Sequence, residues 1–313
     1  MNRRTFAASM AAAAVSTTSL KPRQLFGADK AAANEPAEDA GHDLPIKLSV
    51  MLWTILRDLP FEQRLQKVAE AGYSNVELVG EYARWTPDEF DRAIAARKKS
   101  GITFDATAGL KHGVCNPADR EALLDDLREA LVSMEKLECP SIILLSGNVV
   151  PGLSREAQHQ SCIDGLEAAA KLVEGKTIAG SPVRLLLETI DPEENPKYFL
   201  TSAAEAFEVV KAVDRPQVKF LYDFFHEQIA EGNLIAKLEK NIERVAVVHI
   251  ADVPGRHEPG TGEINYESIF RKLGQLRYSG TIAMEFQPTG DPVVQLAQAR
   301  KTAERCYREG LRK

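Results

Sequence analysis

Four side chains that can bind a metal ion end or interrupt apolar runs in the second half of the chain. They are Glu188 in LLLET, Asp223 in FLYD, His249 in VVHIA and Glu285 in AMEF. Two glutamates, an aspartate and one imidazole form an oxygen-rich ligand set, which suits Mn²⁺ or Mg²⁺ and also accepts Co²⁺ or Zn²⁺. Because carboxylates are costly to bury unpaired, we expect one divalent cation to compensate them. The alternative is a structural network in which each carboxylate pairs with a lysine or an arginine.

Further polar and aromatic side chains follow other apolar runs. Glu77 lies within NVELVG, His112 comes after ITFDATA, and Trp53 comes directly after IKLSVML. We expect Glu77 and His112 to lie near a substrate, and Trp53 either to form a wall of its pocket or to pack in the core. Of the 6 histidines, four follow such a run, namely His112, His226, His249 and His257.

These candidates are distributed along a regular alternation of two kinds of segment. Short runs rich in Val, Ile and Leu alternate with longer segments whose apolar residues recur at helical spacing, such as PFEQRLQKVAEAG. The short runs occupy residues 46–52, 75–80, 102–108, 141–146, 183–189, 218–223, 245–251 and 281–286. Eight strand-then-helix units predict an α/β fold, the (β/α)8 TIM barrel. The active site of such a barrel lies at the C-terminal ends of its strands, where the candidates fall.

An open, doubly wound sheet is the rival fold. Such a sheet usually has a glycine-rich phosphate-binding turn after its first strand. Here the first apolar run continues into WTILRD, which contains no glycine. The barrel is therefore the prediction.

The segment after the seventh run, HIADVPGRHEPGTGEI, is longer and more highly charged than a simple turn requires. We expect His249 to end the strand as a ligand and Arg256 to offer a fork to a substrate oxygen or carboxylate. Gly260 and Gly262 allow backbone conformations that other residues disfavour, so PGTG is suited to hold the loop over the site. The alternative is a surface loop with a solvated Arg–Glu pair.

Four motifs together, LLLETID, LYDFFHEQ, VHIADVPGRHEPGTGEINY and AMEFQP, resemble the hydroxypyruvate isomerase branch of the xylose-isomerase-like sugar isomerase and epimerase family. The resemblance covers roughly residues 46–310 and is strongest from residue 183 onward. It implies that the four metal-binding candidates match the metal ligands of ketose epimerases, and that Glu188 and Glu285 match the family's acid/base pair. It also implies substrate contacts for His226 and Arg256.

The resemblance implies an aldose–ketose type isomerase that acts on a small hydroxy-carbonyl compound. A divalent metal would polarise the carbonyl, and two glutamates would move a proton through an enediolate. Hydroxypyruvate is the first expected substrate. The chain departs from hydroxypyruvate isomerases at His249, where they carry glutamine and ketose epimerases carry histidine. A ketose 3-epimerase acting on a free sugar is therefore the alternative, and a noncatalytic exported sugar-binding barrel is a third.

The composition narrows the classes of function. The chain has 313 residues, 44% of them hydrophobic and 27% charged, and a formal net charge of -6. That balance argues against nucleic acid as a partner, and so against a metal-dependent endonuclease of the same barrel class. The 4 cysteines form no CxxC pair. The expected partner is a small hydroxy-carbonyl or sugar substrate, and the composition is also compatible with a homo-oligomer.

The N-terminal residues resemble a twin-arginine export signal. Arg3 and Arg4 precede a mildly apolar stretch in MNRRTFAASMAAAAVSTTSL. We therefore expect a signal peptide at 1–28, a linker at 29–43 and the barrel at 44–313, with a periplasmic location. Without export the protein would be cytoplasmic. No later stretch approaches the about 18 consecutive apolar residues of a membrane span.

Replacing both arginines by lysine tests this signal, because the arginine pair is read by a receptor. Arg3→Lys with Arg4→Lys should keep the protein in the cytoplasm, as measured by fractionation and immunoblotting. Arg23→Lys, outside the pair, is the matched control and should be exported like the parent. Equal export of the double variant would show that the twin-arginine interpretation is wrong.

Overall fold

A computed structural model describes residues 44–312, and it confirms the predicted barrel. Eight parallel strands close into a ring in the order β1-β10-β9-β8-β7-β4-β3-β2. The barrel strands are β1 (Lys47–Met51), β2 (Asn75–Val79), β3 (Thr103–Ala108), β4 (Ser141–Leu145), β7 (Arg184–Glu188), β8 (Val218–Asp223), β9 (Val245–Ile250) and β10 (Thr281–Met284). Two short strands, β5 (Thr177–Ile178) and β6 (Ser181–Pro182), form a separate antiparallel pair.

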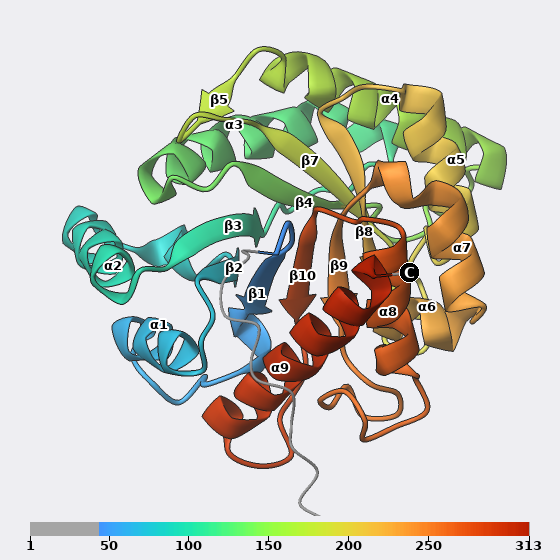
Figure 1. Cartoon of the computed structure of the whole chain (residues 1–313). Helices are drawn as coiled ribbons and strands as arrows, with labels where there is room; N and C mark the ends of the chain where they lie inside the picture. The colour runs from blue at the N-terminus through green and yellow to red at the C-terminus, as the bar shows by residue number, and fades with distance from the viewer. Residues whose placement is uncertain (1–43, 313) are drawn as a thin grey trace, which may run out of the picture. The chain divides into compact units, whose positions relative to one another are not determined.

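Helices cover the outside of the barrel (Figure 1). They are α1 (Phe61–Glu70), α2 (Pro87–Ser100), α3 (Arg120–Leu137), α4 (Arg155–Val173), α5 (Ala203–Val213), α6 (Phe224–Ala230), α7 (Leu234–Asn241), α8 (Tyr266–Gln275) and α9 (Pro292–Leu311). Short 3-10 turns lie in the connections between strands and helices, namely η1 (Leu52–Thr54), η2 (Glu81–Arg84), η3 (Pro117–Asp119) and η4 (Ile242–Arg244). Within residues 44–312 none of the helices combines the length and the apolar character needed to cross a membrane.

Local sequence signals set where several helices begin. Thr86 and Glu89 form a capping box at the start of α2, with Pro87 at the first helical position. The Asp291 side chain accepts a hydrogen bond from the backbone N–H of Val294 at the start of α9, which Pro292 opens. Both pairs satisfy backbone donors that the first turn leaves free.

Two apolar layers make up the core. The larger one lies between the strands and the helices and includes Phe104, Phe220 and Tyr307, which are fully buried. The smaller one fills the inside of the barrel and consists of Met51, Ala106, Ile143, Leu186, Leu221, Val247 and Ala283. The two alanines of this inner layer, Ala106 on β3 and Ala283 on β10, pair in register with larger polar residues of the neighbouring strands, Glu77 and His249.

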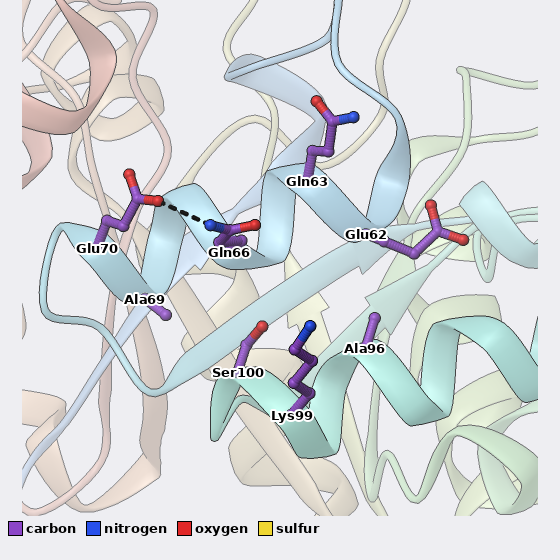
Figure 2. A pocket seen from close by; sticks show the side chains of 8 residues that line it. All are labelled: Glu62, Gln63, Gln66, Ala69, Glu70, Ala96, Lys99 and Ser100. Carbon is purple, nitrogen blue, oxygen red and sulfur yellow. Dashed lines mark hydrogen bonds between the residues drawn. The ribbon is translucent and has the colours of Figure 1, made fainter.

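A groove of about 580 Å³ runs between α1 and α2 on the outside of the barrel. Figure 2 shows mainly polar side chains along it, with Gln66 donating a hydrogen bond to Glu70 at 3.1 Å. Its lining consists of Glu62, Gln63, Gln66, Ala69, Glu70, Ala96, Lys99 and Ser100. None of the predicted site residues lines this groove.

A buried carboxylate lies near the N-terminal end of the barrel. The register of β2 and β3 shifts so that Val76 pairs with Phe104 and Glu77 with Ala106, which leaves Asp105 as the extra residue. The Asp105 side chain is 5% exposed, and Lys47 lies 3.8 Å from it. Neither of its carboxylate oxygens has a hydrogen-bond partner. Burial raises the pKa of Asp105 to about 7, although Lys47 opposes the shift.

Asp105 should therefore make the stability of the fold depend on pH. In the unfolded chain an aspartate titrates at a pKa of about 4, so between about pH 4 and about pH 7 the unfolded state releases this proton and the folded state keeps it. The contribution of the protonated carboxyl to the free energy of unfolding is complete below about pH 4 and is lost as the pH rises toward about 7. Asp105→Asn has no group that titrates at this position. From about pH 5 to about pH 8, the free energy of unfolding of the wild type should therefore fall relative to that of the variant.

Urea unfolding at both pH values measures this difference. The exposed Asp125→Asn is the matched control, since its side chain is 70% exposed. A constant difference between Asp105→Asn and the wild type at the two pH values would contradict the assignment.

Candidate metal and substrate site

Four of the predicted residues converge at the C-terminal end of the barrel. Each of Glu188, Asp223, His249 and Glu285 offers one ligand atom, and these atoms all lie within 4.8 Å of one another. All four side chains are buried, with exposures between 0% for His249 and 7% for Glu188. The sequence prediction that these residues share a site is thus consistent with their positions in the fold.

Four consecutive strands of the ring bring these residues together. Glu188 is the last residue of β7, Asp223 is the last of β8, His249 lies in β9, and Glu285 follows β10. His249 pairs in register with Asp223 on one side and with Ala283 on the other. Since neighbouring strands are parallel, their C-terminal ends meet at the same edge. The closed topology therefore creates the cluster.

The donor atoms in the cluster are not saturated by hydrogen bonds. His249 Nδ1 lies 2.6 Å from Glu285 Oε2 and 3.7 Å from Glu188 Oε1. Both of the closest atoms, His249 Nδ1 and Glu285 Oε2, are buried, and their short contact lies outside ideal hydrogen-bond geometry. Three carboxylates and one imidazole nitrogen are a donor set that a divalent cation accepts. The residues present fit such an ion.

Arg256 supplies positive charge beside the cluster. Its Nη2 lies 3.1 Å from Asp223 Oδ2 and 2.8 Å from Glu285 Oε2, and its Nη1 donates to Glu194 Oε2 at 3.0 Å. The guanidinium is centred 4.7 Å from the Phe225 ring and 5.4 Å from the Trp53 ring. The guanidinium is thus held between aromatic faces and turned toward carboxylates, a geometry to which arginine is suited.

The two glutamates of the cluster have opposite proton affinities. Burial raises the pKa of Glu188 to about 8, helped by the charges of Glu285 and Asp223 and opposed by that of His249. Burial would also raise the pKa of Glu285, but the positive charges of Arg256 and His249 outweigh it and hold this pKa well below its usual value. In the absence of a cation, Glu285 is therefore the ionised carboxylate and Glu188 the one that more readily keeps a proton.

Both histidines of the site are surrounded by acidic groups. Burial would lower the pKa of His249, but Glu285 and Glu77 raise it well above its usual value. Burial would also lower the pKa of His226, but Asp223 and Asp191 raise it to about 9. The Asp191 carboxylate lies 2.6 Å from His226 Nδ1.

The loop that carries Arg256 is organised around the carboxylate of Asp252. This side chain accepts hydrogen bonds of 2.9 to 3.0 Å from the backbone N–H groups of Val253, Gly260, Gly262 and Ile264. A Cβ at Gly262 would lie 2.0 Å from the Val253 carbonyl oxygen, so glycine is required there. The loop over the site is thereby fixed, as the PGTG motif predicts.

The chain is similar in sequence to a known family and to named enzymes. The model of the family described as "Xylose isomerase-like TIM barrel" matches residues 65–310. The chain belongs to this family. It is 34% identical to the 2-oxo-tetronate isomerase of Pectobacterium atrosepticum, over 78% of this chain and 93% of that protein. It is 28% identical to the hydroxypyruvate isomerase of Escherichia coli K12, over 78% of this chain and 94% of that protein.

A solved structure shows the same family likeness in three dimensions. A Brucella melitensis protein named AP endonuclease, family 2, superposes with a TM-score of 0.73 at 28% identity, covering 82% of this chain and 98% of that one. Together with the curated relatives, which are named isomerases, the family shows that the chain is an enzyme of the isomerase and epimerase type.

Three further predicted residues occupy different surroundings. Trp53, in η1, donates from Nε1 to Glu285 Oε1 at 2.5 Å and therefore lines the cluster. Glu77 is fully buried, and its carboxylate lies 2.7 Å from His249 Nε2. His112 bonds through Nδ1 to Asp126 of α3 at 2.9 Å and does not belong to the cluster.

Two acidic residues on the loop after β7 belong to the site but are absent from the sequence prediction. Asp191 bonds to His226 and accepts backbone hydrogen bonds from Glu193 and Glu194, while Glu194 accepts from Arg256. Both follow a predicted strand within the motif ETIDPEEN. The strand-end rule that selected the other candidates would also have selected Asp191.

Proposed function

We propose that this enzyme is a divalent-metal-dependent isomerase of short 2-oxo acids, with hydroxypyruvate as the first substrate and a four-carbon 2-oxo acid as the second. The observation that carries the proposal is the convergence of four ligand atoms within 4.8 Å, two of them from glutamates. The names of the relatives, 2-oxo-tetronate isomerase and hydroxypyruvate isomerase, support the choice of substrate. Mn²⁺ or Mg²⁺ is the proposed ion, since most of the donors are carboxylate oxygens.

Binding of the substrate rests on Arg256 and His226. Arg256 Nη1 lies 3.0 Å from Glu194, whose side chain is 43% exposed, so a substrate carboxylate can replace that partner. His226 Nε2 lies 3.4 Å from Arg256 Nη1, and its raised pKa makes it a second positive group. Two adjacent cations favour a 2-oxo acid over an uncharged sugar. Trp53 forms a wall beside them.

The chemistry rests on Glu188 and Glu285. Isomerisation of hydroxypyruvate removes a proton from carbon 3 and delivers one to carbon 2, while the hydroxyl proton moves to the other oxygen. A bound divalent cation supplies polarisation of the carbonyl and stabilisation of negative charge. We assign removal of the carbon-bound proton to Glu285, whose ionised carboxylate is held by Trp53 and Arg256. We assign return of a proton on the neighbouring carbon to Glu188, which more readily keeps a proton.

The proposal extends to where the enzyme works. Residues 1–28, proposed as a twin-arginine signal, and the linker at 29–43 lie outside the residues that the structure describes. We propose export to the periplasm, with residues 44–313 as the catalytic domain.

Turnover in D₂O tests the proton transfer. If Glu285 and Glu188 exchange the substrate proton with solvent, NMR of the product should show deuterium on the carbon beside the carbonyl. Glu285→Gln should lower kcat by roughly 10²- to 10⁴-fold, as expected for loss of a general base. Arg256→Ala should mainly raise KM. Glu208→Gln, an exposed position on α5, should change neither constant.

Three outcomes would contradict the proposal. Turnover without deuterium in the product would point to a hydride shift and remove the glutamate mechanism. Binding of hydroxypyruvate, four-carbon 2-oxo acids and free ketoses without turnover of any would favour the noncatalytic barrel. Inversion of a free ketose with label, and no reaction of 2-oxo acids, would identify the ketose 3-epimerase instead.

A further inference from the structure

Glu77 and His249 make a contact through the middle of the barrel. Glu77 lies on β2 and His249 on β9, which are not neighbours in the ring. Glu77 pairs in register with Ala106, and His249 pairs with Ala283, so small neighbours leave space for both long side chains. Glu77 and His249 are both 0% exposed. The contact is therefore fully enclosed by the protein.

The contact uses one of the two imidazole nitrogens, and the other nitrogen faces the cluster. Glu77 Oε2 lies 2.7 Å from His249 Nε2, within hydrogen-bond geometry. His249 Nδ1 points toward the opposite side, into the cluster, and lies 2.6 Å from Glu285 Oε2 and 3.7 Å from Glu188 Oε1. The raised pKa of His249 describes the ring without a cation, whereas an imidazole that binds a metal is neutral, with its proton on one nitrogen and a lone pair on the other. A carboxylate accepting from Nε2–H therefore directs the lone pair of Nδ1 into the cluster.

We propose that Glu77 is a positioning residue for the metal site, which accepts a hydrogen bond from His249 Nε2–H and so presents Nδ1 as the ligand atom. This inference rests on the proposed metal-dependent function. Histidine ligands usually donate their second N–H to a carboxylate, a carbonyl or water, which fixes the ring and makes the ligand nitrogen more basic. Glu77 acts through His249 and contacts neither the substrate nor the ion.

The cost of burying Glu77 supports a specific role. A carboxylate removed from water destabilises a protein unless it is paired, and Glu77 Oε1 has no hydrogen-bond partner at all. His249 Nε2 donates to the other carboxylate oxygen, Glu77 Oε2. A purely structural position in this apolar interior would be better filled by a residue such as Met51 or Leu186, which line the same layer.

The affinity for Mn²⁺ measures this role without reference to catalysis. In competition with a chromophoric chelator, Glu77→Gln should weaken Mn²⁺ binding by about 10- to 100-fold, the usual effect of losing such a partner. Asp105→Asn is the matched control, because it also removes a buried carboxylate from the barrel interior and lies outside the ligand cluster. Its affinity for Mn²⁺ should remain close to that of the wild type.

A double-mutant cycle shows whether Glu77 acts through His249. If it does, Glu77→Gln should have almost no further effect on Mn²⁺ affinity in a His249→Ala background. Additive effects in the cycle, or a Glu77→Gln affinity equal to that of Asp105→Asn, would overturn the inference. A wild-type chain that binds no Mn²⁺ would instead contradict the proposed function itself, so the two failures are distinguishable.

A measurement on the wild type covers the case in which the variants do not fold. In protein with ¹⁵N-labelled histidine and loaded with diamagnetic Mg²⁺, the spectrum of His249 should show a proton on Nε2 and none on Nδ1. A proton on Nδ1 would overturn the inference, because Nδ1 could then not be the ligand atom.

Discussion

Three carboxylates buried at one end of the barrel are the constraint on which the site depends. Glu188, Asp223 and Glu285 each lie on or just past a different strand, and their negative charges repel one another at short range. Arg256 neutralises part of this charge through Asp223 and Glu285, and His249 neutralises part through its ring. Three carboxylates still face one arginine and one imidazole, which is the electrostatic reason why we propose a cation here.

The rest of the fold serves to hold these charges in place. The ring of strands sets the spacing of the four ligands, and the loop built on Asp252 holds the Arg256 backbone, whose carbonyl accepts from Gln287 N at 2.7 Å. Asp223 also caps α6 by accepting from the Phe225 backbone N–H at 2.7 Å. One carboxylate thus ends a strand, starts a helix and faces the cluster. Rigid elements of this kind keep a site precise.

The fold and the centre of the site were predictable from the sequence for a physical reason. Parallel strands buried on both faces produce apolar runs, and a charged residue at the end of such a run stands out, as Glu188 in LLLET and Glu285 in AMEF do. All eight predicted strands are present, with ends that agree or differ by at most two residues. The shared edge of a parallel barrel then brings the strand-end residues together.

The remaining contacts depend on side-chain directions that periodicity does not encode. Glu77 and His249 are 172 positions apart and meet through the barrel interior, so the position of Glu77 on a strand did not reveal that His249 is its partner. His112 also follows a strand, yet Asp126 on α3 draws its ring away from the cluster. Asp105 is buried through a local shift in register that the pattern ITFDATA does not reveal.

The metal content of the purified chain tests the central claim most directly. After incubation with Mn²⁺ and removal of the free ion, elemental analysis should find about one ion per chain, as one cluster of four ligands predicts. Asp223→Asn and Glu188→Gln, which remove one ligand charge each, should retain clearly less. A wild-type chain without a bound ion, or with the same content as both variants, would contradict the account.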